Sequence, residues 1–256
     1  MSDREKNKLV ARFKDLADRA YATNCYTFTQ FLNPSELAEL DEAKREFPFA
    51  RFRVNGGYEA AERCVACFGD EETFGYAESW PVVVVKVRPL APKFADELSH
   101  RDFLGAVMNL GIKREILGDI LVKNGRSAYI ICLDNIAPFI CENLTRIKHT
   151  TVVCEVVEDE ADLEKLKPTL IPLSLTVSSL RFDALVAAVT KCSRSETIRL
   201  FQSEKVTLNG RVCTENSKQL KNFDIFSIRG YGKFKYNGSS GETRKGRLHA
   251  EVLKYD

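Results

Sequence analysis

Arg181 and Arg194 are the residues of this sequence whose type and position point most directly to a binding site. Each stands where a helix is predicted to begin: one covers residues 181–190, and the other follows Ser193, which forms a capping-box pattern with Glu196. A cation is disfavoured at a helix N-terminus, where the helix dipole and the free backbone amides favour an anion. A phosphate at such a place can accept hydrogen bonds from both the amides and the guanidinium. The two arginines therefore indicate a site for an anionic ligand.

The distribution of charge supports this location. Residues 171–256 hold 15 Lys or Arg against 8 Asp or Glu, whereas residues 1–80 hold 11 against 15, so the net charge of +2 conceals a basic C-terminal third. Such an imbalance is typical of a segment that binds a polyanion such as RNA, although a basic surface that only serves solubility would show it as well. The other predicted RNA contacts of this segment are Lys191, Ser193, Lys205, Asn209, Arg211, Arg229 and Lys233.

A secondary anion-binding candidate lies in the middle of the chain. Ser99 and Asp102 form another capping-box pattern, which predicts a helix over residues 99–110. Side chains beside the exposed amides at its start could meet an anion there. The secondary set of predicted RNA contacts is His100, Arg101, Lys113 and Arg114.

The eight cysteines predict neither a disulfide framework nor a metal centre. Their spacing is irregular, and most lie in apolar segments, where cysteine behaves as a small buried hydrophobe. Cys64 and Cys67 form a C-x-x-C pair, but a structural zinc ion needs four ligands, and no second pair has the spacing to supply them. We expect reduced, structural cysteines, no metal and no cofactor.

The hydropathy pattern argues against membrane association. The longest apolar run, over residues 81–85, has the length of a strand, far below the roughly 18 residues of a membrane span. The start of the sequence lacks the apolar segment of a secretory signal. We therefore expect a cytoplasmic protein.

Hydrophobic periodicity divides the chain into three segments, and the expected fold class is α+β. Residues 1–80 are predicted to form a small N-terminal α/β domain with an amphipathic first helix, a second helix capped by Asn33, and strands near residues 49–54 and 63–68. Residues 159–172 are acidic and contain two prolines, so they are expected to be a linker.

The middle segment, residues 81–158, is predicted to follow the order β-α-β-β-α-β of a ferredoxin-like fold. Many RNA-recognition domains share this order and stack bases on aromatic residues of their central strands. Here those strands offer only Tyr129, and the RNP1 pattern is absent, so a structural role for this RRM-like sheet is favoured. The predicted strands cover residues 82–88, 119–123, 127–133 and 151–157, and the predicted helices cover 99–110 and 135–146.

The third segment, residues 173–256, contains the two helices that start beside arginines and then several short strands. The pair Asn209-Gly210 predicts a tight hairpin turn, and a polar, glycine-containing stretch over residues 237–241 predicts the loop of a C-terminal hairpin. The predicted strands cover residues 206–208, 225–229, 233–236 and 247–253.

Several stretches of the sequence resemble known protein families. Four stretches resemble an S4 RNA-binding domain in order and spacing: SLRFD (179–183), SRS (193–195), KVTLNG (205–210) and DIFSIRG (224–230). Three more are similar to the bacterial YlmH family: GGYEAAER (56–63), HRDFLG (100–105) and GIKRE (111–115).

The resemblance implies an N-terminal domain, an RRM-like middle domain and a C-terminal S4 domain. It also implies binding to ribosomal RNA of the large ribosomal subunit that carries a peptidyl-tRNA, in ribosome-associated quality control of stalled chains. The residues that match RNA contacts of such S4 proteins are Arg181 and Arg194, followed by Lys205 and Asn209.

Three functional hypotheses remain open. The first is a non-catalytic, monomeric protein that binds folded RNA through its phosphates. The second is an RNA-modifying enzyme of the pseudouridine synthase or methyltransferase type, because S4 domains accompany such enzymes; Arg181-Phe182-Asp183 resembles a pseudouridine synthase triplet, but no catalytic domain or Gly-rich cofactor loop accompanies it. The third is a partner protein whose acidic residues 1–80 dock another factor.

Overall fold

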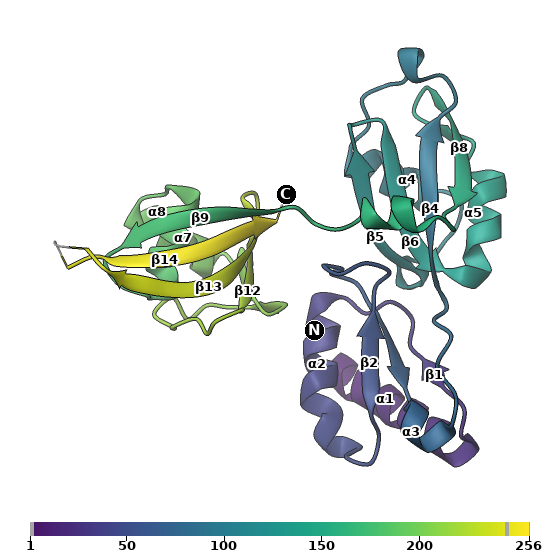
Figure 1. The fold of residues 1–256 in the computed structure, drawn as a ribbon, viewed down its shortest axis with the longest axis horizontal. Coiled ribbons are helices and arrows are strands. Elements are labelled where there is room, and N and C mark those ends of the chain that lie inside the picture. Colours follow the sequence, from purple (N-terminus) through teal and green to yellow (C-terminus); the bar gives the residue numbers. More distant parts are fainter. Residues whose placement is uncertain (1–2, 244–245, 256) are drawn as a thin grey trace. The chain divides into compact units, whose positions relative to one another are not determined.

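The computed structural model describes residues 3–243 and 246–255 of the 256-residue chain, without the side chains of residues 160 and 161. The chain forms two compact units, Met1–Lys167 and Pro168–Asp256. Helices and antiparallel sheets make up both units (Figure 1), which confirms the expected α+β class. Among the described residues, no helix is both long and apolar enough to cross a bilayer.

The N-terminal part of the first unit packs two helices on a small antiparallel sheet with strand order β1-β3-β2. Phe13 of the first helix, Phe47 and Phe68 are fully buried between these layers. Asn33 caps the second helix as predicted, because its side chain accepts from the backbone N–H groups of Ser35 and Glu36 at 2.9 and 3.1 Å. The elements are α1 (Asp3–Thr23), β1 (Thr27–Phe28), α2 (Pro34–Ala43), β2 (Phe52–Asn55), β3 (Val65–Phe68) and α3 (Glu71–Phe74).

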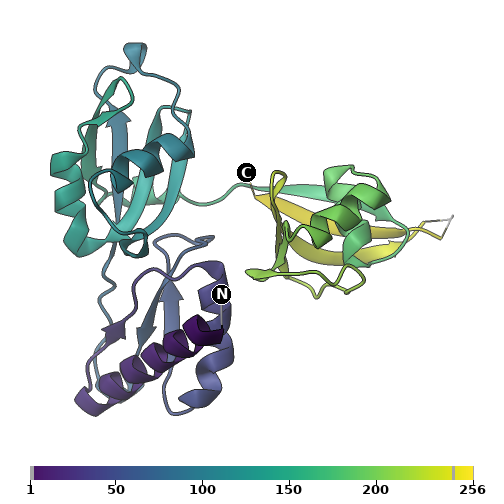
Figure 2. The same ribbon diagram turned by 180° about the vertical axis from the view of Figure 1, so that it is seen from behind.

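The second part of this unit is an antiparallel sheet with strand order β5-β6-β4-β8-β7. Helices α4 and α5 cover one face of it, as Figure 2 shows, and Phe103 and Ile140 anchor them in the core. The helix predicted to reach residue 146 ends earlier, because Arg146–Ile147 pairs with the next strand. The elements are β4 (Val82–Pro89), α4 (His100–Met108), β5 (Leu117–Lys123), β6 (Ser127–Leu133), α5 (Ala137–Asn143), β7 (Arg146–Ile147) and β8 (Thr150–Val156).

Residues 159–172, expected to be a linker, contain structure at both ends. Helix α6 (Glu160–Glu164) is held to the first unit by an ion pair of 2.6 Å between Asp162 and Lys86, and Leu166 is buried there. Strand β9 (Leu170–Val177) already belongs to the second unit and includes Pro172. A proline is tolerated in this strand because β9 lies at the edge of its sheet and pairs only with β14.

The second unit is a six-stranded antiparallel sheet with order β11-β10-β12-β13-β14-β9, and two helices lie on one of its faces (Figures 1 and 2). Phe182 lies at the centre of the core and makes edge-to-face contacts with Phe201 and Phe226, with ring centres 5.1 and 5.4 Å away. The remaining elements are α7 (Phe182–Thr190), α8 (Arg194–Gln202), β10 (Val206–Leu208), β11 (Arg211–Val212), β12 (Ile225–Ile228), β13 (Gly232–Glu242) and β14 (Leu248–Tyr255).

The sequence predicts a tight turn at Asn209-Gly210 and a loop over residues 237–241 in this sheet, and the structure has only the first of these. Asn209 and Gly210 have φ values of 47° and 80° and join β10 to β11, so the predicted hairpin turn is confirmed. The loop predicted over residues 237–241 is wrong, because β13 continues through these residues with two irregularities in its register. Gly238, at φ 111°, lies at one of them, where glycine allows a bulge that other residues resist.

Candidate nucleic-acid interface

Both predicted arginines lie at helix starts, but the two starts differ in their free amides. Arg181 is the N-cap of α7, and the N–H groups of Phe182 and Asp183 donate to the carbonyl oxygens of Lys218 and Asn216 at 2.8 and 2.9 Å. The first amides of α7 are therefore not available to a phosphate, contrary to the expectation from sequence. At the start of α7, only the guanidinium of Arg181 is left to bind an anion.

The start of α8 keeps the arrangement that the sequence predicts. Ser193 is the N-cap and forms a capping box with Glu196, whose carboxylate accepts from the Ser193 N–H at 2.8 Å. These hydrogen bonds lower the pKa of Glu196. Within the described part of the chain, the backbone N–H groups of Arg194 and Ser195 donate to no other group, and the Arg194 side chain is exposed and unpaired. This helix start can receive an anion.

Arg181 is paired within its own helix turn. Its Nε and Nη2 donate to the two carboxylate oxygens of Asp183 at 3.1 and 2.9 Å, and this hydrogen-bonded pair raises the pKa of Arg181. The Asp183 side chain is 11% exposed, whereas that of Arg181 is 42% exposed. The guanidinium thus remains on the surface in a fixed orientation.

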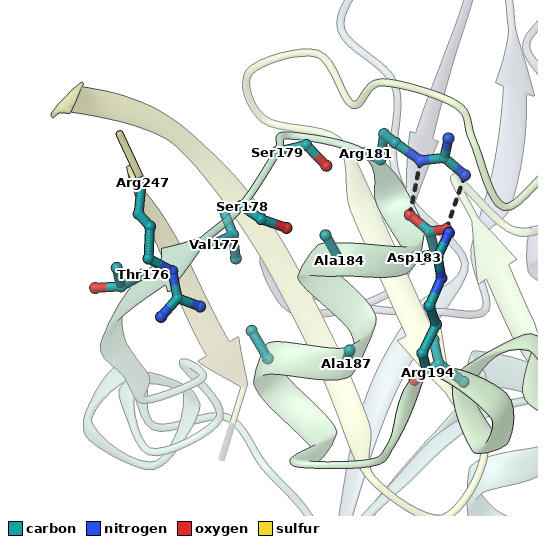
Figure 3. Close-up of a pocket in the computed structure, with 12 residues that line it drawn as sticks. Thr176, Val177, Ser178, Ser179, Arg181, Asp183, Ala184, Ala187, Arg194 and Arg247 are labelled. Atoms are coloured by element: carbon teal, nitrogen blue, oxygen red, sulfur yellow. Dashed lines mark hydrogen bonds and ion pairs between the residues drawn. The ribbon is translucent and has the colours of Figure 1, made fainter. Parts of the chain in front are cut away.

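A hollow of about 440 Å³ separates these two arginines from a third one, Arg247. Its floor is α7, where Ala184 and Ala187 have side chains too short to fill it, and Figure 3 shows them between Arg247 on one side and Arg181 and Arg194 on the other. The hollow therefore combines a small-residue floor with guanidinium groups around its rim. We call Arg181, Arg194 and Arg247 the rim arginines.

Sequence reasoning missed Arg247. The pairing of β14 with β9 brings it to the hollow, because Leu248 lies opposite Val177 and the preceding residue then borders the segment that leads into α7. The two strands are about seventy residues apart in sequence, and the local pattern around Arg247 is that of an ordinary strand end. Its only signal was its place in the basic C-terminal third.

A second group of predicted contacts lies at the turns of this unit rather than at the hollow. Lys191 ends α7 with φ 58° and is exposed. Lys205 and Arg229 are exposed neighbours, because the Arg229 N–H donates to the Lys205 carbonyl oxygen at 2.9 Å. The structure brings Lys205 and Arg229 together, but none of the three lines the hollow.

Three other predicted contacts have structural partners. The side chain of Asn209 donates to Asp224 at 2.8 Å and accepts from the N–H of Ile225 at 2.9 Å, so it closes the hairpin. The Lys233 Nζ lies 5.1 Å from the centre of the Tyr255 ring. Arg211 is half-buried in β11. Asn209 and Lys233 thus make contacts within the second unit itself.

The secondary set of predicted RNA contacts, in the middle of the chain, also contains exposed residues and one with structural partners. His100, Arg101 and Lys113 are exposed. Arg114 is half-buried, and its Nη1 donates to the carbonyl oxygens of Leu117 and Gly118 at 2.7 and 2.9 Å. Burial lowers the pKa of Arg114. Its predicted role as an RNA contact therefore gives way to a structural one.

The cysteines of the described structure form no disulfide bonds with one another. All eight are free thiols, and no group of three or more His, Cys, Asp or Glu side chains in residues 3–243 and 246–255 is arranged to hold a metal ion. Cys64 and Cys67 are both buried in the N-terminal part. Burial raises the pKa of Cys67 to about 12, so this thiol stays protonated at neutral pH.

Comparison with known proteins connects this architecture to a family. A protein of Bacillus subtilis (strain 168) named "Ribosome-associated protein quality control protein P2" is 30% identical over 220 residues, which are 85% of this chain and 82% of the relative. Models described as "YlmH, N-terminal" and "Putative RNA-binding domain in YlmH" match residues 5–73 and 77–161. The chain belongs to the YlmH family. The resemblance of the sequence motifs to the YlmH family is thus confirmed.

One solved structure carries the same family name. "Cell division protein ylmH from Streptococcus pneumoniae" is similar to this YlmH-family chain with a TM-score of 0.49 and 19% identity, over 61% of this chain and 93% of that chain. The second of the two matched segments ends at residue 161, so the rim arginines lie outside both segments. The two models therefore assign no role to the hollow.

Proposed function

We propose that this YlmH-family chain is a non-catalytic protein that binds structured RNA of the large ribosomal subunit through the rim arginines. The observation that carries the proposal is the hollow on α7, with three guanidinium groups around a floor of alanines. In this proposal Pro168–Asp256 is an S4 domain, and residues 81–158 form a ferredoxin-like, RRM-like domain. The name of the B. subtilis relative supports a place in ribosome-associated protein quality control. That the bound subunits carry a peptidyl-tRNA is implied by the resemblance of the sequence motifs and is part of the proposal.

The geometry suits a nucleic-acid backbone better than a small anion. Guanidinium groups bind phosphate oxygens through pairs of parallel hydrogen bonds, and three of them around an open hollow can contact successive or facing phosphates. The alanines of α7 leave space for a ribose-phosphate strand to approach the helix. Such contacts recognise the shape of folded RNA rather than its sequence.

The proposal that the chain is not an enzyme rests on Asp183, the one carboxylate that lines the hollow among the described residues. Asp183 is the acidic member of the triplet that resembles a pseudouridine synthase motif, but both of its oxygens accept hydrogen bonds from Arg181. A nucleophile or general base has to reach its substrate from the protein surface, and this side chain is largely buried. Incubation with ribosomal RNA followed by mass spectrometry of its nucleosides should reveal no new modification.

Cosedimentation with purified large ribosomal subunits tests the RNA-binding proposal. We expect the charge reversals Arg194→Glu and Arg247→Glu, combined, to abolish cosedimentation at 150 mM salt. The matched control combines Arg12→Glu and Lys14→Glu on the exposed face of α1, which changes the net charge equally. If about three phosphates are neutralised, wild-type affinity should fall roughly 20- to 40-fold between 50 and 200 mM salt. Equal cosedimentation of both variants would remove the hollow from the binding site.

A further inference from the structure

The sheet of the middle domain is covered on both faces. Its strands alternate, so that Val85 and Ile130 face the helices α4 and α5, whereas Tyr129 and Ile131 face the other way. In RNA-recognition domains the face without helices is the one on which bases stack. Here that face lies in a second core together with Phe31 of the N-terminal part.

The fit on this face leaves no room for a base. Tyr129 is 6% exposed and Ile131 is fully buried. A methyl group at Gly118 would approach the ring of Phe31 to 2.8 Å, so the two parts are in direct contact there. Leu166 and the ion pair between Lys86 and Asp162 close the face from the side of α6. Any RNA that contacts this domain must therefore use another surface.

The opposite side of the domain has an open, basic hollow of about 430 Å³ between α4, α5 and the turn from β7 to β8. Arg101, Arg146 and Lys148 supply its cations, and Asn109 and Asn143 supply side-chain amides. Gly105 of α4 has no neighbouring heavy atom within 4 Å of where a side chain would begin, so the helix surface at this point is open. We call this the α4–β7 hollow.

The residues that line the α4–β7 hollow carry more positive than negative charge. Lys148 pairs with Asp102, the one carboxylate that lines the hollow in the described structure, with Nζ and Oδ2 2.8 Å apart. The Arg146 Nε donates to the Lys148 carbonyl oxygen at 3.0 Å, which leaves its Nη groups for a ligand. Arg101 is exposed and makes no ion pair among the described residues. Two guanidinium groups are thus left to meet an anion.

We propose that the α4–β7 hollow binds the phosphate backbone of RNA through Arg101 and Arg146, and that the middle domain contacts RNA by its helical side instead of its sheet. The inference rests on the proposed function in taking RNA as the ligand. The two side-chain amides can donate to ribose or phosphate oxygens, and the open helix surface allows a backbone to come close. The binding is independent of the rim arginines, which lie in the other unit.

The test uses the full chain and deproteinised large-subunit ribosomal RNA, measured by filter binding across a salt series. We expect the double variant Arg101→Glu, Arg146→Glu to bind at least tenfold more weakly than wild type, and its log–log salt slope to be smaller by about two. The neutral variant Arg101→Gln, Arg146→Gln should lie in between. The control is again Arg12→Glu with Lys14→Glu, and circular dichroism checks that each variant is folded.

The outcomes separate this inference from the proposed function. If the α4–β7 variants bind RNA as the α1 control does, while the rim variant Arg194→Glu, Arg247→Glu binds weakly, the inference is overturned and the proposed function stands. If the α4–β7 variants bind RNA normally but lose affinity for intact subunits, the ligand of this hollow is a ribosomal protein and the RNA assignment is again overturned. If wild type does not bind RNA at all, both proposals fail.

Discussion

Arg181 holds Asp183 by two hydrogen bonds within one helix turn, from Nε to Oδ1 and from Nη2 to Oδ2. The carboxylate lies at the start of α7, where the helix dipole favours a negative charge, and the guanidinium that would be disfavoured there is neutralised by it. The pair explains how a cation can be held at a helix N-terminus without a bound phosphate. Arg181 is therefore both a part of the fold and an exposed group of the rim.

This double role separates the two helix-start arginines in an alanine test. Arg181→Ala should weaken RNA binding and also lower the melting temperature of the protein, because it leaves the largely buried Asp183 carboxylate unpaired. Arg194→Ala should weaken RNA binding with an unchanged melting temperature, because Arg194 has no partner within the described residues. Each should lose about 10- to 100-fold in affinity, the range for hydrogen bonds to charged groups.

Filter binding and a thermal melt measure the two effects separately. Arg12→Ala on α1 serves as the control and should change neither quantity, since its side chain is exposed on the helix surface. A normal melting temperature for Arg181→Ala would show that the pair with Asp183 contributes nothing to the fold. An equal loss of stability in both variants would contradict the distinction between them.

The local patterns of the sequence were sufficient for the helix starts. The capping boxes at Ser99 and Ser193 and the cap at Asn33 involve residues three positions apart, and all three are present in the structure. The same holds for the turn at Asn209, which needs only a residue pair that accepts positive φ. Elements of this kind are set by neighbours in the sequence.

What could not be predicted depends on distant strand pairing and on the groups that each side chain meets in the fold. Arg247 reaches the hollow only because β14 pairs with β9, and β9 itself was obscured by Pro172 and by the acidic residues before it. The sequence also does not show which group a basic side chain will contact. Arg114 donates to backbone carbonyl groups of β5, whereas the neighbouring Lys113 stays exposed. The type and spacing of residues thus identified a basic surface, but not which of its members are free to bind.

Asn209 offers a test of a residue whose matching motif implied RNA contact. Its side chain closes the β10–β11 turn and bridges to Asp224 and Ile225. Asn209→Ala should lower the free energy of unfolding of the second unit by roughly 2 kcal/mol, from two lost hydrogen bonds and a strained positive φ. Asn209→Gly, which accepts that φ, should lose only about 1 kcal/mol.

Native-state hydrogen exchange of the strands β10 and β12 measures this stability within the whole chain. RNA affinity of Asn209→Gly should stay within about threefold of wild type, because the side-chain amide is already hydrogen-bonded to Asp224 and Ile225. A loss of RNA binding in Asn209→Gly as large as that of Arg194→Ala would instead make Asn209 a direct contact.

The cysteines should differ sharply in reactivity. Cys25 is exposed, whereas burial raises the pKa of both Cys67 and Cys132 to about 12. At pH 8 only roughly one in ten thousand molecules then carries either buried thiol as the reactive thiolate. Brief treatment with iodoacetamide, read by mass spectrometry, should modify Cys25 and leave Cys67 and Cys132 intact, and unfolding in urea should expose all eight. Fast labelling of Cys67 in the folded protein would contradict its buried position.

The contact between α6 and the sheet should make the first unit sensitive to acid. Hydrogen bonds from Lys165 and Lys86 lower the pKa of Asp162 to about 2, below the value of about 3.9 of an unfolded chain. A carboxyl group with a lowered pKa in the folded state stabilises the fold above its unfolded pKa, and this contribution disappears as the pH falls from about 4 toward 2. The effect requires that α6 stays on the sheet face.

Carboxyl NMR of Asp162 between pH 1.5 and 5 measures this directly. The wild-type pKa should be near 2, and Lys165→Met and Lys86→Met should each raise it, because each removes one of the two cations. Asp162→Asn should reduce the loss of stability between pH 4 and 2, and it should also increase hydrogen exchange at the covered face of β6, around Tyr129, whose hydroxyl donates to Asp162 at 3.4 Å. An ordinary pKa for Asp162 would mean that α6 does not hold this face closed, and RNA access to the sheet would then have to be reconsidered.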